Sequence, residues 1–279
     1  MSTKDGGVAP SRGNALVVVF GRLRVAIGVV HCLALPGSPA YDGASIDTIC
    51  DRALADAVAY ADGGLHGLII ENHGDIPFSK PEDIGQETAA AMAVITDRVR
   101  REVGLPLGIN VLANGALTAL AVAKAAGASF IRVNEWANAY VANEGIIEGP
   151  AARATRYRSW LRANDVAVFA DVHVKHGAHA IVADRTISEL TRDVEFFDAD
   201  GVIVTGQRTG DAAAREEVQE VRDATPLPLL IGSGVTRENV GALMELADGV
   251  IIGSSLKRGG AWWGPVDGGR AREFMALFR

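Results

Sequence analysis

The sequence has few of the features that mark secreted, membrane-spanning or disulfide-stabilised proteins. It contains only two cysteines, Cys32 and Cys50, which cannot form a disulfide framework and lack zinc-site spacing, so we expect a reducing compartment. The most apolar N-terminal stretch, Ala15 to Pro36, is broken by two arginines and a histidine, too soon for a membrane span or a signal-peptide core. We therefore predict a cytoplasmic protein without a membrane span.

An excess of positive charge is also missing. The 27 Lys and Arg residues stand against 34 Asp and Glu, giving a net charge of -7, and the basic residues are scattered along the chain. Nucleic-acid binding needs concentrated positive charge, so we expect no such partner. No charge run or Pro/Ser-rich linker divides the chain, which predicts one domain over residues 15–279. We expect the Gly- and Ser-rich residues 1–14 to form a disordered leader.

What the sequence does contain is a regular alternation of short β-branched runs and longer amphipathic segments. This alternation is typical of repeated βα units around a parallel sheet, and eight such units need roughly 250 residues. An open doubly wound sheet is the alternative, but the chain lacks its Gly-rich dinucleotide fingerprint. We therefore predict a single (β/α)₈ TIM barrel. The expected strands are Val25–Cys32, Gly67–Asn72, Pro106–Leu112, Ser129–Asn134, Val166–Lys175, Gly201–Thr205, Pro228–Gly232 and Gly249–Gly253.

Residue parity within the strands predicts which side chains face the barrel interior. In the fifth strand, Val166–Lys175, every even position is Val or Ala, which directs Asp171, His173 and Lys175 inward. These polar groups lie toward the carboxyl ends of the strands, where barrels place their active sites. The alternative is a structural plug of paired charges. By the same reading Glu71, Asn110, Arg132 and Asn134 also face inward.

Two loops of small residues follow the seventh and eighth strands, where many barrels bind a phosphate. They contain Gly232, Ser233 and Gly234 in the first loop and Gly253 and Ser254 in the second. Small residues let backbone N–H groups approach an anion, and a following helix N-terminus adds its dipole. A tight turn is the alternative for either loop alone. The pair predicts a phosphate-binding site.

The loop that begins at Glu71 carries further candidates for acid–base chemistry. Glu71, His73 and Asp75 lie within five residues, a grouping suited to proton transfer or to holding a hard cation. The alternative for Asp75 and His73 is that each caps the loop. His31 ends the first strand and is either a base or a packed core residue.

No metal site is predicted firmly. The row His173, His176 and His179 straddles a strand and its loop, which argues against zinc. Mg²⁺ remains open as a cofactor, because oxygen ligands of four residues could converge. Those residues are Glu71, Asp75, Asn110 and Asp171.

Short motifs are spread over nearly the whole chain from Phe20 to Phe278. They are Val29-Val30-His31, Leu35–Pro39, Glu71–Phe78, Gly145–Gly149, Phe169–Val172, Val174–His176, Val202–Gly206 and Gly232–Thr236. Together these motifs resemble the BtpA/SgcQ family. The resemblance implies a (β/α)₈ barrel and an enzyme, and neighbouring sugar-transport genes in the family suggest phosphorylated sugars. The family also includes a factor for photosystem I accumulation.

We therefore predict an enzyme for a small phosphorylated sugar- or nucleoside-like compound, using acid–base chemistry without a redox cofactor. The alternative is a non-catalytic assembly factor or a ligand-binding barrel. We expect a homo-oligomer, with lids or subunit contacts at Leu33–Ser45 and Glu135–Gly149, and Trp262 and Trp263 sealing the last helix or a subunit contact. The expected catalytic residues are Glu71, Asp171, Lys175 and His31, and the expected substrate-binding residues are Asp75, Asn110, Arg132, Asn134, His173 and Thr205.

Overall fold

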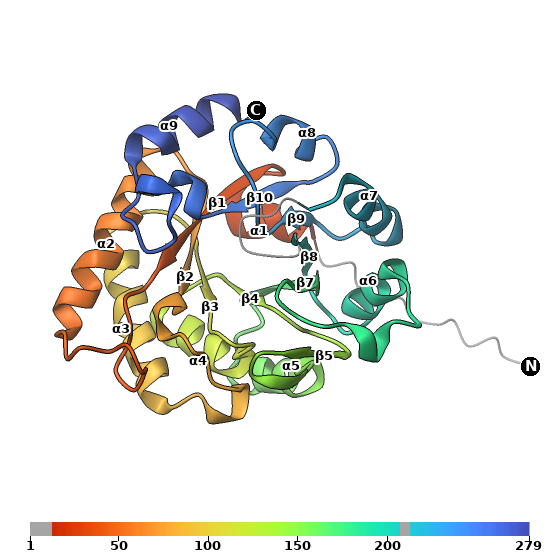
Figure 1. Cartoon of the computed structure of the whole chain (residues 1–279), viewed down its shortest axis with the longest axis horizontal. Coiled ribbons are helices and arrows are strands. Elements are labelled where there is room, and N and C mark those ends of the chain that lie inside the picture. The colour runs from red at the N-terminus through yellow and green to blue at the C-terminus, as the bar shows by residue number, and fades with distance from the viewer. Residues whose placement is uncertain (1–12, 207–212, 279) are drawn as a thin grey trace, which may run out of the picture.

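The chain forms a closed barrel of eight parallel strands surrounded by helices (Figure 1). A computed structural model describes residues 13–206 and 213–278. Strand β1 (Val25–His31) pairs with both β2 and β10, so the sheet closes on itself and the doubly wound alternative is excluded. The predicted TIM barrel is confirmed. The other barrel strands are β2 (Gly67–Glu71), β3 (Leu107–Asn110), β4 (Phe130–Val133), β7 (Ala167–His173), β8 (Gly201–Val204), β9 (Leu229–Ile231) and β10 (Gly249–Ile252).

Helices pack around the outside of this strand ring, and their apolar faces form one continuous layer against the strands. Local sequence explains where several of them begin and end. Ser45 caps one helix by accepting a hydrogen bond from the Thr48 N–H, and another ends at Gly127 in the left-handed conformation. The helices are α1 (Ala15–Phe20), α2 (Ile46–Asp62), α3 (Gln86–Glu102), α4 (Ala116–Ala126), α5 (Ala151–Trp160), α6 (Ile187–Phe196), α7 (Arg215–Ala224), α8 (Val240–Leu243) and α9 (Gly268–Leu277).

Helix α1 closes the amino-terminal end of the barrel and was not expected from the sequence. Asn14, within the expected leader, caps it through its side chain, while residues 1–12 of that leader lie outside the described residues. The Phe20 ring contacts Phe130 and Phe169, with ring centroids 5.4 and 6.5 Å away. Gly108 leaves room for this cluster, since a Cβ there would lie 2.1 Å from the Phe130 ring. This end of the barrel is a packed apolar core.

The long connection after β4 is not irregular but folds into a hairpin of β5 (Ala139–Ala142) and β6 (Gly145–Glu148). Val141 also forms a bridge to Ala178 in the loop after β7. The hairpin therefore lies at the carboxyl end of the strands.

Within residues 13–206 and 213–278, no helix is long and apolar enough to cross a membrane. Cys32 and Cys50 are both free and buried.

Candidate functional site

Polar side chains gather inside the carboxyl end of the barrel, one step along the strands from the apolar core. Register pairs Glu71 with both His31 and Asn110 across neighbouring strands, so these three side chains meet on the inside. Arg132 and Asp171 lie on β4 and β7, which are also adjacent. The structure thus brings together most of the residues that parity directs inward.

Arg132 and Asp171 form a buried bidentate ion pair. Arg132 Nε and Nη2 donate to the two Asp171 carboxylate oxygens over 3.1 and 2.9 Å. Burial alone would lower the pKa of Arg132, but the Asp171 charge raises it above its ordinary value. The Asp171 side chain is fully buried and does not line the cavity described below, so the geometry gives it a positioning role in place of the expected catalytic one. It orients the Arg132 guanidinium.

Glu71 is held from two sides. Its Oε2 accepts a hydrogen bond from Asn110 Nδ2 over 2.8 Å, and its Oε1 lies 3.0 Å from His73 Nδ1. A carboxylate oxygen only accepts, so His73 donates here. Burial alone would raise the pKa of Glu71, but the hydrogen bond from His73 and the nearby Arg132 charge hold it well below its usual range. Glu71 is therefore a fixed, ionised carboxylate.

The His31 side chain faces the barrel interior. The sequence could not predict this direction, because both faces of its strand are apolar. Its Nε2 lies 3.6 Å from Glu71 Oε1, and its Nδ1 lies 3.2 Å from the Trp262 carbonyl oxygen. Lys257 Nζ donates to the same carbonyl over 2.9 Å and lies 3.5 Å from Asp56. Burial lowers the pKa of His31 to about 3, so the ring is neutral near pH 7.

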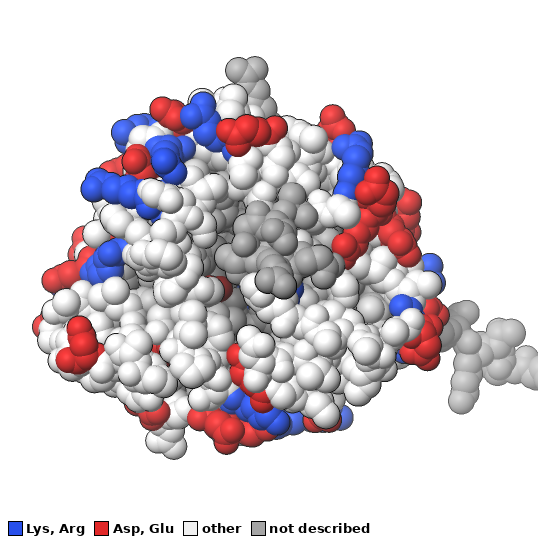
Figure 2. Space-filling view, viewed as in Figure 1, with Lys and Arg blue, Asp and Glu red and all other residues white. Residues whose placement is uncertain are grey.

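Two adjoining cavities open at this end of the barrel. The molecular surface shows a hollow near its centre, with charged side chains mainly toward the periphery (Figure 2). The smaller cavity encloses about 100 Å³ and the larger about 420 Å³. Both are lined by the same five residues where they meet, namely Glu71, His73, Arg132, Lys175 and Trp262. A single ligand in contact with these residues would extend into both cavities.

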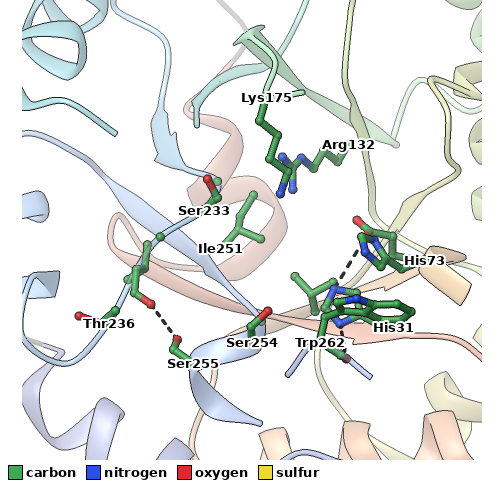
Figure 3. Close-up of a pocket in the computed structure, with 16 residues that line it drawn as sticks. His31, His73, Arg132, Lys175, Ser233, Thr236, Ile251, Ser254, Ser255 and Trp262 are labelled. Carbon is green, nitrogen blue, oxygen red and sulfur yellow. Dashed lines mark hydrogen bonds and ion pairs between the residues drawn. The ribbon is translucent and has the colours of Figure 1, made fainter. Parts of the chain in front are cut away.

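The smaller cavity is bounded by the two predicted phosphate loops. Residues 232–236 and 253–255 line it, including all five expected phosphate-binding residues. Figure 3 shows Arg132 and Lys175 reaching in from the side opposite Ser254 and Thr236. The expected helix dipole is not available, because α8 has only four residues. Among residues 13–206 and 213–278, the groups that can bind an anion here include loop N–H groups and the two cationic side chains.

Glycine is required at the mouth of this cavity for steric reasons. A Cβ on Gly253 would lie 3.1 Å from the His31 ring, and one on Gly232 would lie 3.2 Å from Arg132 Nη2. Gly234 has φ of +68°, in the left-handed region that favours glycine. Side chains at these positions would fill or distort the anion end of the site.

The larger cavity combines apolar walls with unpaired amide oxygens. Phe78, Tyr140 and Trp262 contribute aromatic surface. Asn110 Oδ1 and Asn134 Oδ1 are buried, and among the described residues neither has a hydrogen-bond partner. Buried acceptors of this kind usually have a partner, so both oxygens are available to a ligand donor.

Lys175 extends from the loop after β7 to the boundary of the two cavities (Figure 3). Burial and the neighbouring Arg132 charge lower its pKa from the ordinary lysine value. The side chain is thus placed to contact an anion in the smaller cavity.

Three expected substrate-binding residues do not line either cavity. A bulge between Asp171 and His173 shifts the β7 register and turns His173 outward, where its Nδ1 lies 3.5 Å from Glu217 on α7. Asp75 instead accepts hydrogen bonds from the Leu35 N–H and from the side chain of its neighbour Asn72. Neither His173 nor Asp75 would therefore contact a ligand held in these two cavities.

Thr205 is the third of these residues. Its hydroxyl donates to the His173 carbonyl over 3.1 Å, which ties β8 to the bulge in β7. The four residues considered as oxygen ligands for Mg²⁺ do not converge, because Asp171 pairs with Arg132 and Asp75 accepts from the backbone N–H of Leu35.

Three residues that line the cavities were not among the site residues predicted from the sequence. Trp262, expected to seal a helix or subunit contact, instead lines both cavities and stacks edge-on against His73 with centroids 4.5 Å apart. Tyr140 comes from the unexpected hairpin. The position of His73 two residues after inward-facing Glu71 was the one available signal.

Several known proteins are similar in sequence to this chain over most of its length. A model of the BtpA family matches residues 22–279. The chain is 42% identical over 252 residues to an uncharacterized protein of Archaeoglobus fulgidus, covering 90% of this chain and 97% of that one. It is also 42% identical over 235 residues to the photosystem I biogenesis protein BtpA of Synechocystis sp., covering 84% and 80%.

Solved structures support the fold alone. Thiamine phosphate pyrophosphorylase from Pyrococcus furiosus superposes with a TM-score of 0.57 at 12% identity, covering 92% of this chain and 95% of that one. N-(5'-phosphoribosyl)anthranilate isomerase from the same organism gives 0.56 at 11% identity, covering 91% and 98%. Because the family match and the two relatives span most of the chain, the protein belongs to the BtpA family.

Proposed function

We propose that this protein is an enzyme that acts on a small phosphorylated compound, sugar- or nucleoside-like, by general acid–base chemistry. The observation that carries the proposal is the pair of joined cavities, one suited to an anion and the other to an organic body. The reacting atoms would lie between them, beside Glu71 and His73.

The smaller cavity supports the phosphate end of this substrate. Backbone N–H groups of Gly234, Val235 and residues 253–255 can approach an anion closely because most of the lining residues are small. The N–H groups of Gly232 and Thr236 already donate to Val204 and Asn239. Arg132 supplies a planar cation fixed by Asp171, and Lys175 supplies a second positive group from the same side. The superposed barrels named for phosphate-containing compounds are consistent with this assignment.

The larger cavity supports the organic body. The free oxygens of Asn110 and Asn134 accept hydrogen bonds, which suits the hydroxyl groups of a sugar. Trp262 and Tyr140 offer flat apolar surface for a ring. The site should bind an analogue without these hydroxyl groups more weakly, because the buried amide oxygens would then have no hydrogen-bond donor.

Proton transfer is assigned to Glu71 and His73. The Glu71 carboxylate is ionised and can take a proton, while the hydrogen-bonded His73 ring can relay or return one. Both side chains line the two cavities where they meet. Asp171 contributes indirectly by holding Arg132.

The test is turnover of a panel of pentose phosphates, hexose phosphates and nucleoside monophosphates, followed by ³¹P NMR, beside their unphosphorylated counterparts. We expect at least one phosphorylated compound to be consumed and its counterpart to persist. Glu71→Gln should retain the circular dichroism spectrum but lose turnover, and Lys175→Met should mainly raise KM. A panel in which no member is bound or consumed would overturn the proposal.

A second candidate function is a non-catalytic one. The Synechocystis relative is named for photosystem I biogenesis, which favours an assembly role that kept the barrel and its ligand site. This candidate predicts binding of a panel compound without consumption. That result would replace the catalytic assignment.

A further inference from the structure

We infer that His31, Glu71 and His73 form a binding site for a divalent first-row transition metal at the edge of the smaller cavity. The inference rests on the proposed function but changes one of its assignments. With an ion bound where the two cavities meet, Glu71 and His73 are its ligands, and a water on the ion would take over the proton transfer assigned to them. The ligand set shares only Glu71 with the oxygen set considered for Mg²⁺, and it rests on geometry within the described chain.

The spacing of the three side chains suits one ion. One ligand atom from each residue lies within 4.8 Å of the others. Glu71 Oε1 is 3.6 Å from His31 Nε2 and 3.0 Å from His73 Nδ1. Ligands about 2.1 Å from a common ion are roughly 3.0–3.5 Å apart, so only small side-chain adjustments are needed.

Two of the three ligands, His31 and Glu71, are also oriented by a second group, as metal ligands usually are. The Trp262 carbonyl can only accept, so the His31 ring carries its hydrogen on Nδ1 and presents the Nε2 lone pair to Glu71. Asn110 holds the far oxygen of Glu71 and leaves Oε1 for the ion. Lys257 fixes the Trp262 carbonyl in turn.

This arrangement leaves two acceptors facing one another. The Nε2 atom of partly buried His31 and the Oε1 atom of buried Glu71 lie 3.6 Å apart, with no donor between them among the described residues. A cation between them removes the repulsion. In the metal-bound form His73 binds through Nδ1 and carries its ring hydrogen on Nε2 instead.

Two imidazole nitrogens and one carboxylate oxygen favour Zn²⁺, Mn²⁺, Fe²⁺, Co²⁺ or Ni²⁺ over Mg²⁺ and Ca²⁺, which prefer all-oxygen sets. Three protein ligands leave coordination positions open. All three residues line the smaller cavity, so these positions face the ligand space. A metal there would act as a Lewis acid on a substrate oxygen or lower the pKa of a bound water.

The test is calorimetric titration of chelator-treated, full-length protein with Zn²⁺ and with Mn²⁺, without any substrate. We expect one saturable site per chain, with His31→Gln and His73→Gln each weakening binding at least tenfold. His173→Gln is the matched control, because His173 and His179 form a second imidazole pair outside the cavities, with ring centroids 3.8 Å apart. That control should bind Zn²⁺ as the wild type does.

X-ray absorption of the Zn²⁺-loaded wild type covers the case in which a variant fails to fold. Two imidazoles and an oxygen ligand around the ion are expected. Absence of saturable binding, wild-type affinity in both histidine variants, or a spectrum with fewer than two imidazoles would overturn the site. Phosphate binding by chelator-treated protein is independent of these results, so failure here is distinguishable from failure of the proposed function.

Discussion

The two ends of the barrel are built from the same strands, yet their inward side chains have opposite character. On β4, Phe130 at the amino-terminal end is followed two residues later by Arg132, and on β7 Phe169 is followed by Asp171. The period of two keeps both members of each pair inside the barrel. One end is closed by α1, whereas the other opens into two cavities.

The apolar side chains at one end stabilise the fold, whereas the polar side chains at the other end form the candidate site. Burying the phenylalanine cluster contributes stability in proportion to the apolar area removed from water. Burying Arg132 and Asp171 carries a desolvation penalty that their attraction offsets only in part. The charged layer therefore contributes little to stability, and its position beside the cavities explains its presence.

The largest expected effect on stability is at the apolar end. Phe130→Ala should lower the free energy of unfolding by about 4 kcal/mol, because it leaves a cavity between Phe20 and Phe169. Urea denaturation measures the loss. Inorganic phosphate should still bind the folded variant with wild-type affinity, and a large change in affinity would contradict the separation of the two ends.

At the polar end, removing one charge should cost nearly as much. Asp171→Asn leaves the buried Arg132 guanidinium without its counter-charge, which should destabilise the protein by about 3 kcal/mol and weaken phosphate binding. The double variant Arg132→Met with Asp171→Leu should recover most of this stability but not the binding. A double variant as unstable as the single one would show that the ion pair is structural.

The smallest expected effect is a pH dependence at the amino-terminal end. His66 Nδ1 accepts a hydrogen bond from the Ala26 N–H, and burial, together with the Arg22 charge, lowers its pKa to about 4. Below pH 6.5 the unfolded chain takes up a proton that the folded chain resists, so stability should fall as pH falls from about 6.5 toward 4.

His66→Asn tests this origin, because Asn Oδ1 can accept from the same N–H without titrating. The melting temperature of this variant should depend less on pH between about 6.5 and 4. The hydrogen bond itself contributes roughly 1 kcal/mol to the free energy of unfolding. An unchanged pH profile would place the sensitivity elsewhere.

The fold and the inward layer could be predicted because both follow from local periodicity. Eight apolar runs indicate eight strands, and parity alone directs Glu71, Asn110 and Arg132 inward. The glycine and serine loops after β9 and β10 were equally visible, because their place in a barrel is fixed by strand order.

The other features of the site could not be predicted, because they depend on an irregular strand or on contacts between residues far apart in the sequence. One extra residue in β7 reverses the direction of His173, and no periodic pattern shows a bulge. Trp262 meets His31 across 231 residues of sequence, so its role appears only when the chain is folded. The ion pair between Asp171 and Arg132 could not be predicted either, because strand parity predicts which way a side chain points but not which residue it contacts.

The proposed function requires that the polar end of the barrel bind the phosphate group of a small molecule. The direct measurement is titration of the wild type, Ser254→Asp and Ser254→Asn with inorganic phosphate. Ser254 lines the smaller cavity, and the two variants differ only in a negative charge. We predict that the wild type and Ser254→Asn bind with similar affinity, while Ser254→Asp binds at least tenfold more weakly by charge repulsion. Equal affinity in all three proteins would contradict the claim.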